Sequence, residues 1–306
     1  MRVFVTGATG FVGSAVVRDL MDAGHRVVGL ARSDQSAAAL EAAGVEAHRG
    51  SLDNADSLRA GAAASDGVIH TAFNNISETT DFVAACEADR RAIEALGEAL
   101  AGSDRPLVIT SGTGLLPAGR LATEEDVPDP DSHAAIRGAS EEAALAFAER
   151  GVRVSVVRLA PSVHSDADKR GFVPSMIGIA RAKGLAAYVG DGSNRWGAVH
   201  QFDAARLFRL ALESAPAGAR LHGIGEEGVP LREIAEVIGR HLNVPVASLS
   251  PQEAAAHFGW LAGFVAMDGP ASSVLTQKQL DWHPQGIGLI ADLEAGHYFA
   301  DASAAA

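Results

Sequence analysis

The chain has little lysine and a single cysteine, and each shortage excludes a class of protein. Only three of its 25 basic residues are Lys. Together the 25 basic and 38 acidic residues give a net charge of −13. A surface that binds nucleic acid or an anionic membrane needs clustered cations, so we expect neither partner. Cys86 has no second cysteine to pair with. This excludes an intrachain disulfide and a cysteine-rich metal site, and we expect no metal.

Long apolar stretches are also absent. The longest nearly apolar run, Phe258–Met267, is far too short to span a bilayer. The first residues lead from a short β-branched run directly into glycine-rich sequence, which is unlike a signal peptide. We therefore expect a cytoplasmic protein. The 306 residues, 47% of them hydrophobic, suffice for one large α/β domain or for such a domain with a smaller partner.

The first half of the chain alternates short apolar runs with helical patterns. Strands are expected at residues 2–6, 26–31, 45–49, 67–71, 106–110 and 152–159, and helices at 11–23, 36–43, 82–101 and 139–150. Continuous apolar runs are typical of strands buried on both faces of a parallel sheet. The pattern therefore predicts an α/β fold with a doubly wound parallel sheet.

A glycine-rich segment between the first strand and the first helix carries the strongest functional signal. Gly7 permits a tight turn, Gly10 lets the backbone approach a pyrophosphate, and Gly13 lets the helix pack closely on the sheet. The helix N-terminus adds free N–H groups and a positive dipole end. The spacing is G-x-x-G-x-x-G, whereas the commoner fingerprint is G-x-G-x-x-G. We expect a Rossmann-type site whose phosphate-binding residues are Thr6, Gly7, Thr9, Gly10, Phe11, Val12 and Gly13.

The end of the second strand selects between the two nicotinamide dinucleotides. NAD sites usually carry Asp or Glu there, to bind the ribose 2′-hydroxyl. Here Ala31 occupies the position and Arg32, which suits a 2′-phosphate, follows it. NADP is therefore the expected cofactor, and Asp34 keeps NAD possible.

Beyond Pro161 the regular alternation stops, and short elements are expected at 231–242, 251–258 and 287–299. We interpret residues 1–164 as the dinucleotide-binding domain, joined by returning segments near 198–225. Residues 165–197 and 226–306 are then a smaller substrate-binding region.

Six segments now match one family in order. They are VTGATGFVG at 5–13, GSLDN at 50–54, VIHTAF at 68–73, VITSGTG at 108–114, VRLAPSVH at 157–164 and AVHQFDAARL at 198–207. In these the chain resembles the extended branch of the short-chain dehydrogenase/reductase superfamily, which includes NAD-dependent epimerases and dehydratases. The resemblance implies that the cofactor is lined by Ser51 and Leu52 at the adenine, His70, Ala72 and Phe73 near the pyrophosphate and ribose, and Pro161, Ser162 and Val163 at the nicotinamide. The family usually has Asp at the position of Ser51.

The family's catalytic pair, Tyr and Lys four residues apart, is missing. The two tyrosines, Tyr188 and Tyr298, have no Lys at the fourth position after them. At the corresponding place stand His133 and Arg137, and the chain is similar here to an atypical subgroup with H-x-x-x-R. A spacing of four puts both side chains on one face of a helix. His133 could protonate a developing alkoxide, and Arg137 could hold ribose hydroxyls and stabilise negative charge. Alternatively, the pair only binds ligand or is surface charge.

Other candidates are less specific. Ser111 is our first choice and Thr113 our second for the hydroxyl that orients a substrate carbonyl, with a turn or cap as the alternative role. The expected substrate residues are Thr113, His164, Phe172, Met176, Arg195, Trp196 and Trp260. Core packing is the alternative for the aromatic side chains, and a surface ion pair for Arg195.

From these residues we expect the protein to be an NADPH-dependent oxidoreductase. It would reduce a carbonyl of a small, partly apolar substrate or catalyse the reverse reaction. One alternative is a nucleotide-sugar epimerase or dehydratase that retains its cofactor. Another is a non-catalytic NADP-binding sensor. By resemblance to the family, the helices at 82–101 and 139–150 form a homodimer interface.

Overall fold

Seven parallel strands form the central sheet, in the order β10-β6-β5-β4-β1-β2-β3. The computed structural model describes residues 1–73, 81–130 and 135–300. The strands are β1 (Arg2–Thr6), β2 (Arg26–Ala31), β3 (Glu46–Arg49), β4 (Gly67–His70), β5 (Pro106–Gly112), β6 (Arg153–Leu159) and β10 (Ala219–Gly223). The expected doubly wound α/β sheet is confirmed.

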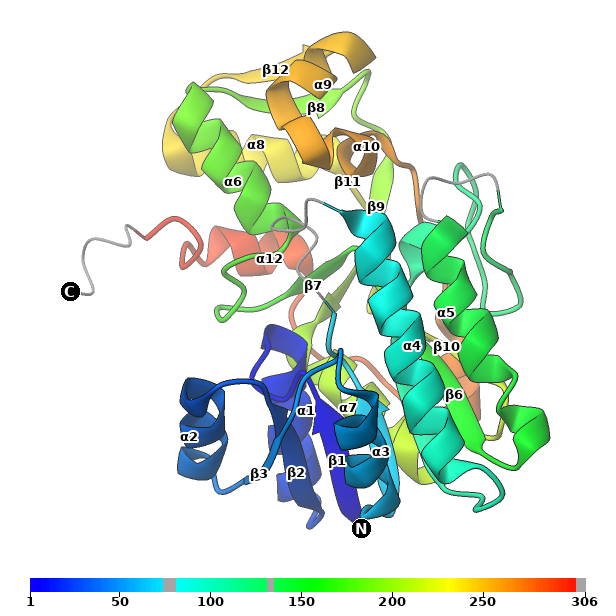
Figure 1. Ribbon diagram of the computed structural model, residues 1–306. Coiled ribbons are helices and arrows are strands. Elements are labelled where there is room, and N and C mark those ends of the chain that lie inside the picture. Colours follow the sequence, from blue (N-terminus) through cyan, green and yellow to red (C-terminus); the bar gives the residue numbers. More distant parts are fainter. Residues whose placement is uncertain (74–80, 131–134, 301–306) are drawn as a thin grey trace.

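Helices cover both faces of this sheet because successive apolar side chains of each strand point to opposite sides. In β1, Val3 and Val5 pack in the core beneath the helices at 11–22 and 201–214, whereas Phe4 packs in the core beneath the helices at 55–63 and 82–100. The first face carries α1 (Phe11–Asp22), α2 (Asp34–Ala42), α7 (Gln201–Ser214) and α11 (Val274–Leu280). The second face carries α3 (Ala55–Ala63), α4 (Phe82–Leu100) and α5 (Ala135–Leu145), with α4 and α5 side by side (Figure 1).

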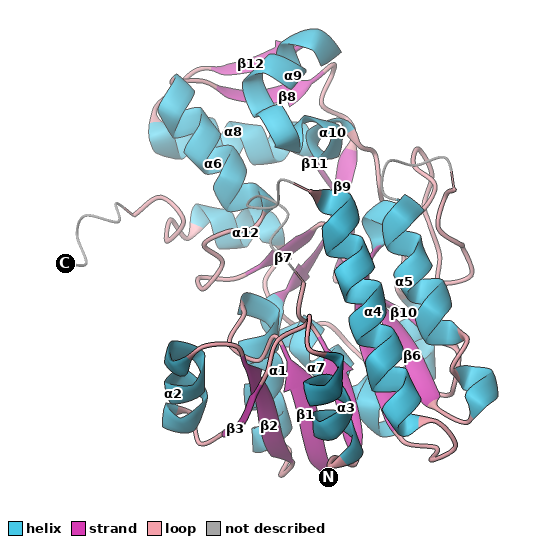
Figure 2. Ribbon diagram, viewed as in Figure 1, coloured by secondary structure: helices cyan, strands magenta, loops and turns pink. Residues whose placement is uncertain are grey.

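A second unit lies beyond the carboxyl ends of the sheet strands (Figure 2). It has a three-stranded sheet, β11-β9-β7, and a parallel pair, β12-β8. Its strands are β7 (Ser162–His164), β8 (Ala186–Val189), β9 (Arg195–His200), β11 (Glu226–Pro230) and β12 (Val246–Leu249). Its helices are α6 (Phe172–Lys183), α8 (Leu231–Leu242), α9 (Pro251–Phe258), α10 (Ala262–Ala266) and α12 (Leu289–Glu294). These elements bury an apolar core of their own.

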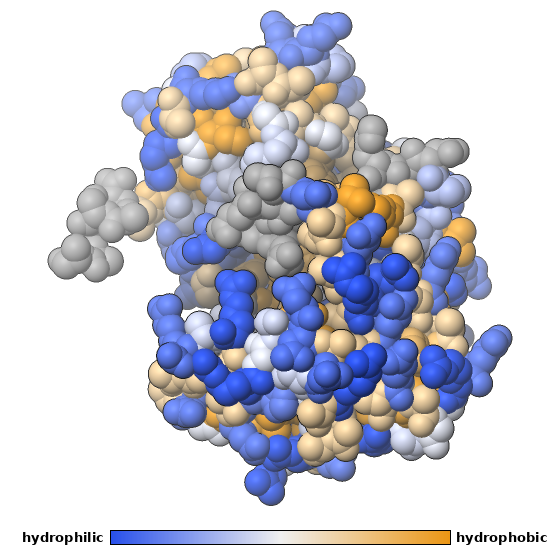
Figure 3. Space-filling view, viewed as in Figure 1, coloured by the Kyte–Doolittle hydropathy of each residue, from blue (hydrophilic) through white to orange (hydrophobic). Residues whose placement is uncertain are grey.

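The strand order reverses between β1 and β4, where the chain leaves the sheet in opposite directions. Ligands of open α/β sheets bind at such a reversal, outside the carboxyl ends of the strands. In Figure 1 the N-terminus lies at the end of the molecule away from the second unit, so β1 runs toward that unit. On the face shown in Figure 3, hydrophilic residues cover much of the lower part of the molecule.

Several boundaries differ from those expected. The helix predicted at 139–150 begins at Ala135 and ends at Leu145, followed by a 3₁₀ turn at Ala148–Arg150. The segment 287–299 is helical only over Leu289–Glu294. The tail from 301 onward lies outside the described residues. Within the described part of the chain, no helix is both long and apolar enough to cross a bilayer.

Candidate active site

The loop after β1 needs glycine at two positions for different reasons. Gly7 has a φ of +71°, and a Cβ on it would lie 2.7 Å from the Ala72 amide nitrogen. A Cβ on Gly13 would lie 2.0 Å from the Gly7 carbonyl oxygen, because α1 crosses directly over the loop. A Cβ on Gly10 would have only that same oxygen near it, at 3.1 Å. Gly10 therefore borders open space, on the side where a ligand would approach.

The N-terminus of α1 keeps its amide donors available. Gly10 is its N-cap and provides no side-chain hydrogen bond, whereas Ser33, Asn54 and Asp81 cap α2, α3 and α4 with their side chains. Uncapped N–H groups and the helix dipole make such an end a phosphate site. The glycine loop and α1 thus fit a dinucleotide pyrophosphate. Thr9 and Gly10 are exposed, and Phe11 and Val12 are half-buried.

Arg32 directly follows β2, at the carboxyl ends of the sheet strands where the glycine loop also lies, and its side chain is exposed. Among the described residues it has no hydrogen-bond or ion-pair partner. Asp34, the acidic residue that could bind a ribose hydroxyl, accepts instead a hydrogen bond of 2.7 Å from Arg49 at the end of β3. Ser51 and Leu52 lie half-buried in the turn that follows β3.

A buried chain of hydrogen bonds leads from the glycine loop to α4. The Thr6 hydroxyl lies 2.7 Å from His70 Nδ1, and His70 Nε2 lies 3.1 Å from Asp89 Oδ1. A neutral imidazole satisfies both contacts when Nε2 carries the hydrogen and donates a hydrogen bond to the carboxylate, while Nδ1 accepts one from the Thr6 hydroxyl. Both ring nitrogens of His70 are therefore engaged within the protein. The Ala72 amide donates to the Thr6 hydroxyl at 3.4 Å.

Arg137 lies in the first turn of α5 and is held on three sides. Its Nη1 donates to Asp89 Oδ2, and its Nη2 donates to the Thr110 carbonyl at 3.0 Å. The guanidinium carbon lies 3.9 Å from the centre of the Phe73 ring, a cation–π contact. Burial raises the pKa of Asp89, but the hydrogen bond from His70 and the charge of Arg137 together lower it by more. The pKa therefore lies below its ordinary value, and the carboxyl stays ionised. His133 lies outside the described residues.

Ser111 and Thr113, at the end of β5, have different partners. The Ser111 hydroxyl donates to Glu141 Oε1 at 2.5 Å, and Glu141 also accepts two-pronged hydrogen bonds from the buried Arg158. Thr113 is buried, and within the described residues its hydroxyl makes a single hydrogen bond, of 3.4 Å, to the Leu159 carbonyl. A bond to a carboxylate is roughly twice as strong as one between neutral groups. Ser111 is therefore held more firmly than Thr113.

Neither tyrosine takes part in this constellation. Tyr188 belongs to β8 in the second unit. The Tyr298 hydroxyl accepts from the Ser165 amide at 3.2 Å and donates to Asp292 at 3.5 Å. Burial, together with the charges of Asp168 and Asp292, raises the pKa of Tyr298 well above its ordinary value, which makes it a poorer acid.

These observations can be compared with known proteins. The model of the NAD-dependent epimerase/dehydratase family matches residues 3–222. The chain belongs to this family.

The chain is also similar to full-length relatives and to solved structures. An uncharacterized protein of Schizosaccharomyces pombe is 49% identical over 301 residues, which are 98% of this chain and 100% of that protein. A 2-alkyl-3-oxoalkanoate reductase of Stenotrophomonas maltophilia is 28% identical over 255 residues, 76% of this chain and 73% of the reductase. The solved structure of Thermus thermophilus UDP-glucose 4-epimerase with NAD matches with a TM-score of 0.77 and 21% identity, covering 98% of this chain and 99% of that one. This last likeness supports the fold.

On the nicotinamide side expected for this family, the chain turns from the central sheet into the second unit. Pro161 precedes β7, in which Ser162 is buried and Val163 half-buried, and β7 pairs with β9. His164, also in β7, is buried, and its Nδ1 lies 2.9 Å from Asp292. Burial lowers the pKa of His164 more than the Asp292 carboxylate raises it, which favours the neutral ring.

An aromatic cluster in the second unit contains several of the expected substrate residues. The Phe172 ring lies 4.5 Å from Phe264, 5.6 Å from Trp196 and 6.0 Å from Trp260, measured between ring centres. Trp196 is fully buried, with its Nε1 donating to the Phe264 carbonyl, whereas Trp260 is 43% exposed. Trp196 therefore has a packing role, and Phe172 and Trp260 are the more accessible aromatic candidates.

Met267, just after α10, lies close to Gly114, which follows β5 in the chain. A Cβ on Gly114 would lie 3.6 Å from the Met267 methyl carbon. The segment that follows the aromatic cluster thus reaches the residue next to Thr113. Arg195, in contrast, is bound by both Nε and Nη2 to Asp268, each at 3.0 Å, which leaves less of its charge for a substrate anion.

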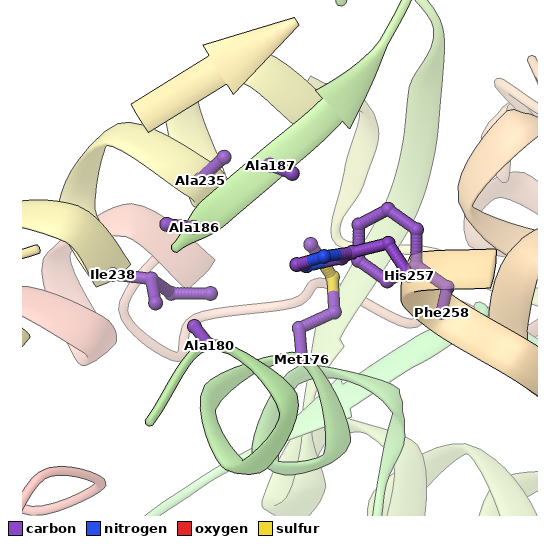
Figure 4. Close-up of a pocket in the computed structure, with 8 residues that line it drawn as sticks. All are labelled: Met176, Ala180, Ala186, Ala187, Ala235, Ile238, His257 and Phe258. Carbon is purple, nitrogen blue, oxygen red and sulfur yellow. The ribbon is translucent and has the colours of Figure 1, made fainter. Parts of the chain in front are cut away.

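Met176 lies elsewhere, in the crevice between α6, β8, α8 and α9 (Figure 4). The crevice is lined by Met176, Ala180, Ala186, Ala187, Ala235, Ile238, His257 and Phe258. It has no room for even a water-sized sphere. Met176 thus packs in the core of the second unit.

Sequence reasoning missed Asp89 and Glu141, the two buried carboxylates that hold Arg137 and Ser111. Each lies on a helix with several other charged residues, so its charge alone did not distinguish it. A signal was available for Asp89, whose neighbours Ala85, Ala92 and Ile93 belong to the buried face of α4. An acidic residue on an apolar helix face requires a buried partner.

Proposed function

We propose that the protein is an NADPH-dependent oxidoreductase that reduces a carbonyl of a small, partly apolar substrate, or catalyses the reverse reaction. The observation that carries this proposal is Arg137, fixed near the carboxyl end of β5 and linked through Asp89 and His70 to the residue before the glycine loop, in a site without tyrosine. Such a site can bind a nicotinamide ribose and stabilise negative charge, but it needs another proton donor. The similarity to a protein named as a reductase supports the same reaction class.

The cofactor is proposed to be NADP, with NAD as the weaker ligand. Arg32 is exposed and without a partner in the described part of the chain, while the competing Asp34 is paired with Arg49. A guanidinium matches a phosphate in charge and geometry. Bound NADPH would supply the hydride that reduces the carbonyl carbon.

His133 is proposed to donate the proton to the carbonyl oxygen. It precedes Arg137 by four residues, and imidazole transfers protons near neutral pH. For the hydroxyl that orients the carbonyl, the hydrogen bonds favour Thr113 over Ser111, because only Ser111 is committed to a carboxylate. The apolar part of the substrate would then lie near Met267, Phe172 and Trp260.

A panel of ketones, aldehydes and imines, followed at the NADPH absorbance, tests this function. We expect NADPH oxidation with at least one carbonyl class, and a large loss of turnover in His133→Ala and His133→Gln. Wild-type turnover in both variants would exclude His133 as proton donor. NAD retained through purification would instead favour an epimerase or dehydratase. Tight NADPH binding with no turnover across the panel would favour a sensor.

A homodimer through α4 and α5 is proposed from the family resemblance. The two helices lie side by side on one face of the sheet (Figure 1). Val83, in the first turn of α4, is 51% exposed although apolar. Size-exclusion chromatography with light scattering should give about twice the chain mass of 31.5 kDa, and a mass of 31.5 kDa would refute the dimer.

A further inference from the structure

The structure places a carboxylate behind Arg137 that neither the family match nor the motif at 133–137 assigns. Asp89 is almost completely buried in α4 and accepts from three side chains. Its Oδ2 accepts from Arg137 Nη1 and, at 2.7 Å, from the Ser140 hydroxyl, and its Oδ1 lies 3.1 Å from His70 Nε2. Both carboxylate oxygens of Asp89 thus accept hydrogen bonds from other side chains of the protein.

Arg137 needs such a partner more than a lysine would. A guanidinium keeps its proton at any physiological pH, so it cannot escape burial by becoming neutral. Its five N–H groups lie in one plane, and that plane is fixed when Asp89 and the Thr110 carbonyl bind Nη1 and Nη2 and Phe73 covers one face. The donors not used by these contacts then have a fixed direction.

The second oxygen of Asp89 extends this arrangement to the phosphate-binding loop. Through His70 it connects to Thr6, the residue immediately before Gly7. One carboxylate therefore joins the glycine loop, which fits the pyrophosphate of a dinucleotide, to α5, the helix that carries Arg137.

We infer that Asp89 is a positioning residue, which orients Arg137 toward the nicotinamide ribose and fixes its distance from the glycine loop. The inference rests on the proposed function in so far as Arg137 is the ribose-binding cation. It predicts a loss of affinity that is equal for NADPH and NADH, because the nicotinamide ribose is common to both.

The experiment measures the dissociation constants of NADPH and NADH by isothermal titration calorimetry, together with thermal unfolding. Asp89→Asn keeps the shape and removes the charge, and we expect both cofactors to bind about tenfold more weakly. Asp19→Asn is the matched control, since Asp19 accepts at 2.7 Å from Arg209 between α1 and α7, outside the site. It should lower the melting temperature without changing either affinity. Ser140→Ala, which removes one donor to Asp89, is the milder variant should Asp89→Asn fail to fold, and it should weaken both cofactors in the same sense.

A double variant separates positioning from a merely structural role. In Arg137→Lys the compact ammonium is drawn toward Asp89 and away from the cofactor, so binding should weaken. Adding Asp89→Asn removes that attraction, and the double variant should bind both cofactors more tightly than Arg137→Lys alone. Losses that simply multiply, or an Asp89→Asn variant of lower stability with unchanged affinities, would overturn the inference. Failure of the carbonyl panel leaves these binding measurements unaffected, so the two proposals fail separately.

Discussion

At the scale of single residues, Arg26 and Arg32 offer a direct comparison. Both are exposed arginines, one at the start of β2 and the other just beyond its end, where we propose that the cofactor binds. Arg32→Ala should weaken NADPH binding by about 10- to 100-fold, because a charge-assisted hydrogen bond contributes about 1.5–3 kcal/mol. NADH affinity should not change. Titration calorimetry of both cofactors measures this, with Arg26→Ala as the control. Unchanged NADPH affinity in Arg32→Ala, or equal wild-type affinities for the two cofactors, would rule out the role given to Arg32.

The roles of the two hydroxyls at the end of β5, Ser111 and Thr113, can be tested separately. Thr113→Val keeps the volume and removes a hydroxyl with only a weak internal partner, so turnover of a carbonyl substrate should fall about 10- to 100-fold at nearly constant stability. Ser111→Ala breaks the hydrogen bond to Glu141 and should reduce stability by about 1–2 kcal/mol, with a smaller effect on turnover. Steady-state kinetics and denaturant unfolding of both variants test the assignment. A larger kinetic loss in Ser111→Ala would restore the order expected from sequence.

The sequence predicted residues whose role depends on local chain geometry better than residues whose role depends on tertiary partners. Gly7 and Gly13 could be assigned because a turn and a close helix crossing follow from three glycines between a strand and a helix. Asp89 lies 48 residues before Arg137 in the chain, and only the packing of α4 against α5 brings the two together. No local pattern contains that contact.

At the scale of secondary-structure elements, the glycine loop and α1 make two different demands on glycine. Gly13→Ala places a methyl group 2.0 Å from a backbone oxygen and should destabilise the fold by about 1–3 kcal/mol or more. Gly10→Ala has a near neighbour only at 3.1 Å and an ordinary extended φ of −78°, so the fold should tolerate it. Its methyl group should instead hinder the approach of the pyrophosphate. Thermal unfolding and cofactor titration of both variants distinguish the two effects. Equal loss of stability in both would contradict this division.

The ends of the helices show where sequence patterns lose precision. The boundaries of α8 and α9 match the expected 231–242 and 251–258, and α9 has a clear N-terminal signal in Ser250, Pro251 and Glu253. The pattern predicts the start of α5 at 139, whereas the helix spans Ala135–Leu145 and includes Gly138. In the structure Gly138 is buried, with Pro128 close to the position of its missing side chain. A packing contact, which the local sequence pattern does not contain, thus favours glycine at this position of the helix.

At the scale of the whole molecule, the parallel sheet followed from the alternation of strands and helices, but its seventh strand did not. β10 joins the sheet beside β6 only after the chain has formed β7, α6, β8, β9 and α7. The sequence indicated that segments near 198–225 return to the first domain, without showing which of them pairs. That choice depends on the register of Ala219–Gly223 with Ser155–Leu159, which is a tertiary property.

The pH dependence of stability is a property of the whole molecule that buried histidines should dominate above pH 5. Burial lowers the pKa of His164 and of His222 below their ordinary 6.5; Asp292 opposes this at His164 and Glu124 at His222. As the pH falls through 6.5, the unfolded chain takes up protons that the folded chain does not. The free energy of unfolding should therefore decrease, by at most about 1.4 kcal/mol per pH unit for each histidine. The carboxyls with lowered pKa, such as Asp89, lose their contribution only at lower pH.

Replacing one histidine isolates this effect from all other titrating groups. In His222→Asn the amide can still donate to the Ser272 carbonyl, as Nδ1 does at 2.8 Å, but it has no proton to gain. Denaturant unfolding between pH 5 and 7 should give a shallower loss of stability in this variant than in the wild type. His283→Asn is the control, because His283 is exposed on the surface. Parallel pH profiles for His222→Asn and the wild type would show that His222 does not contribute to acid sensitivity.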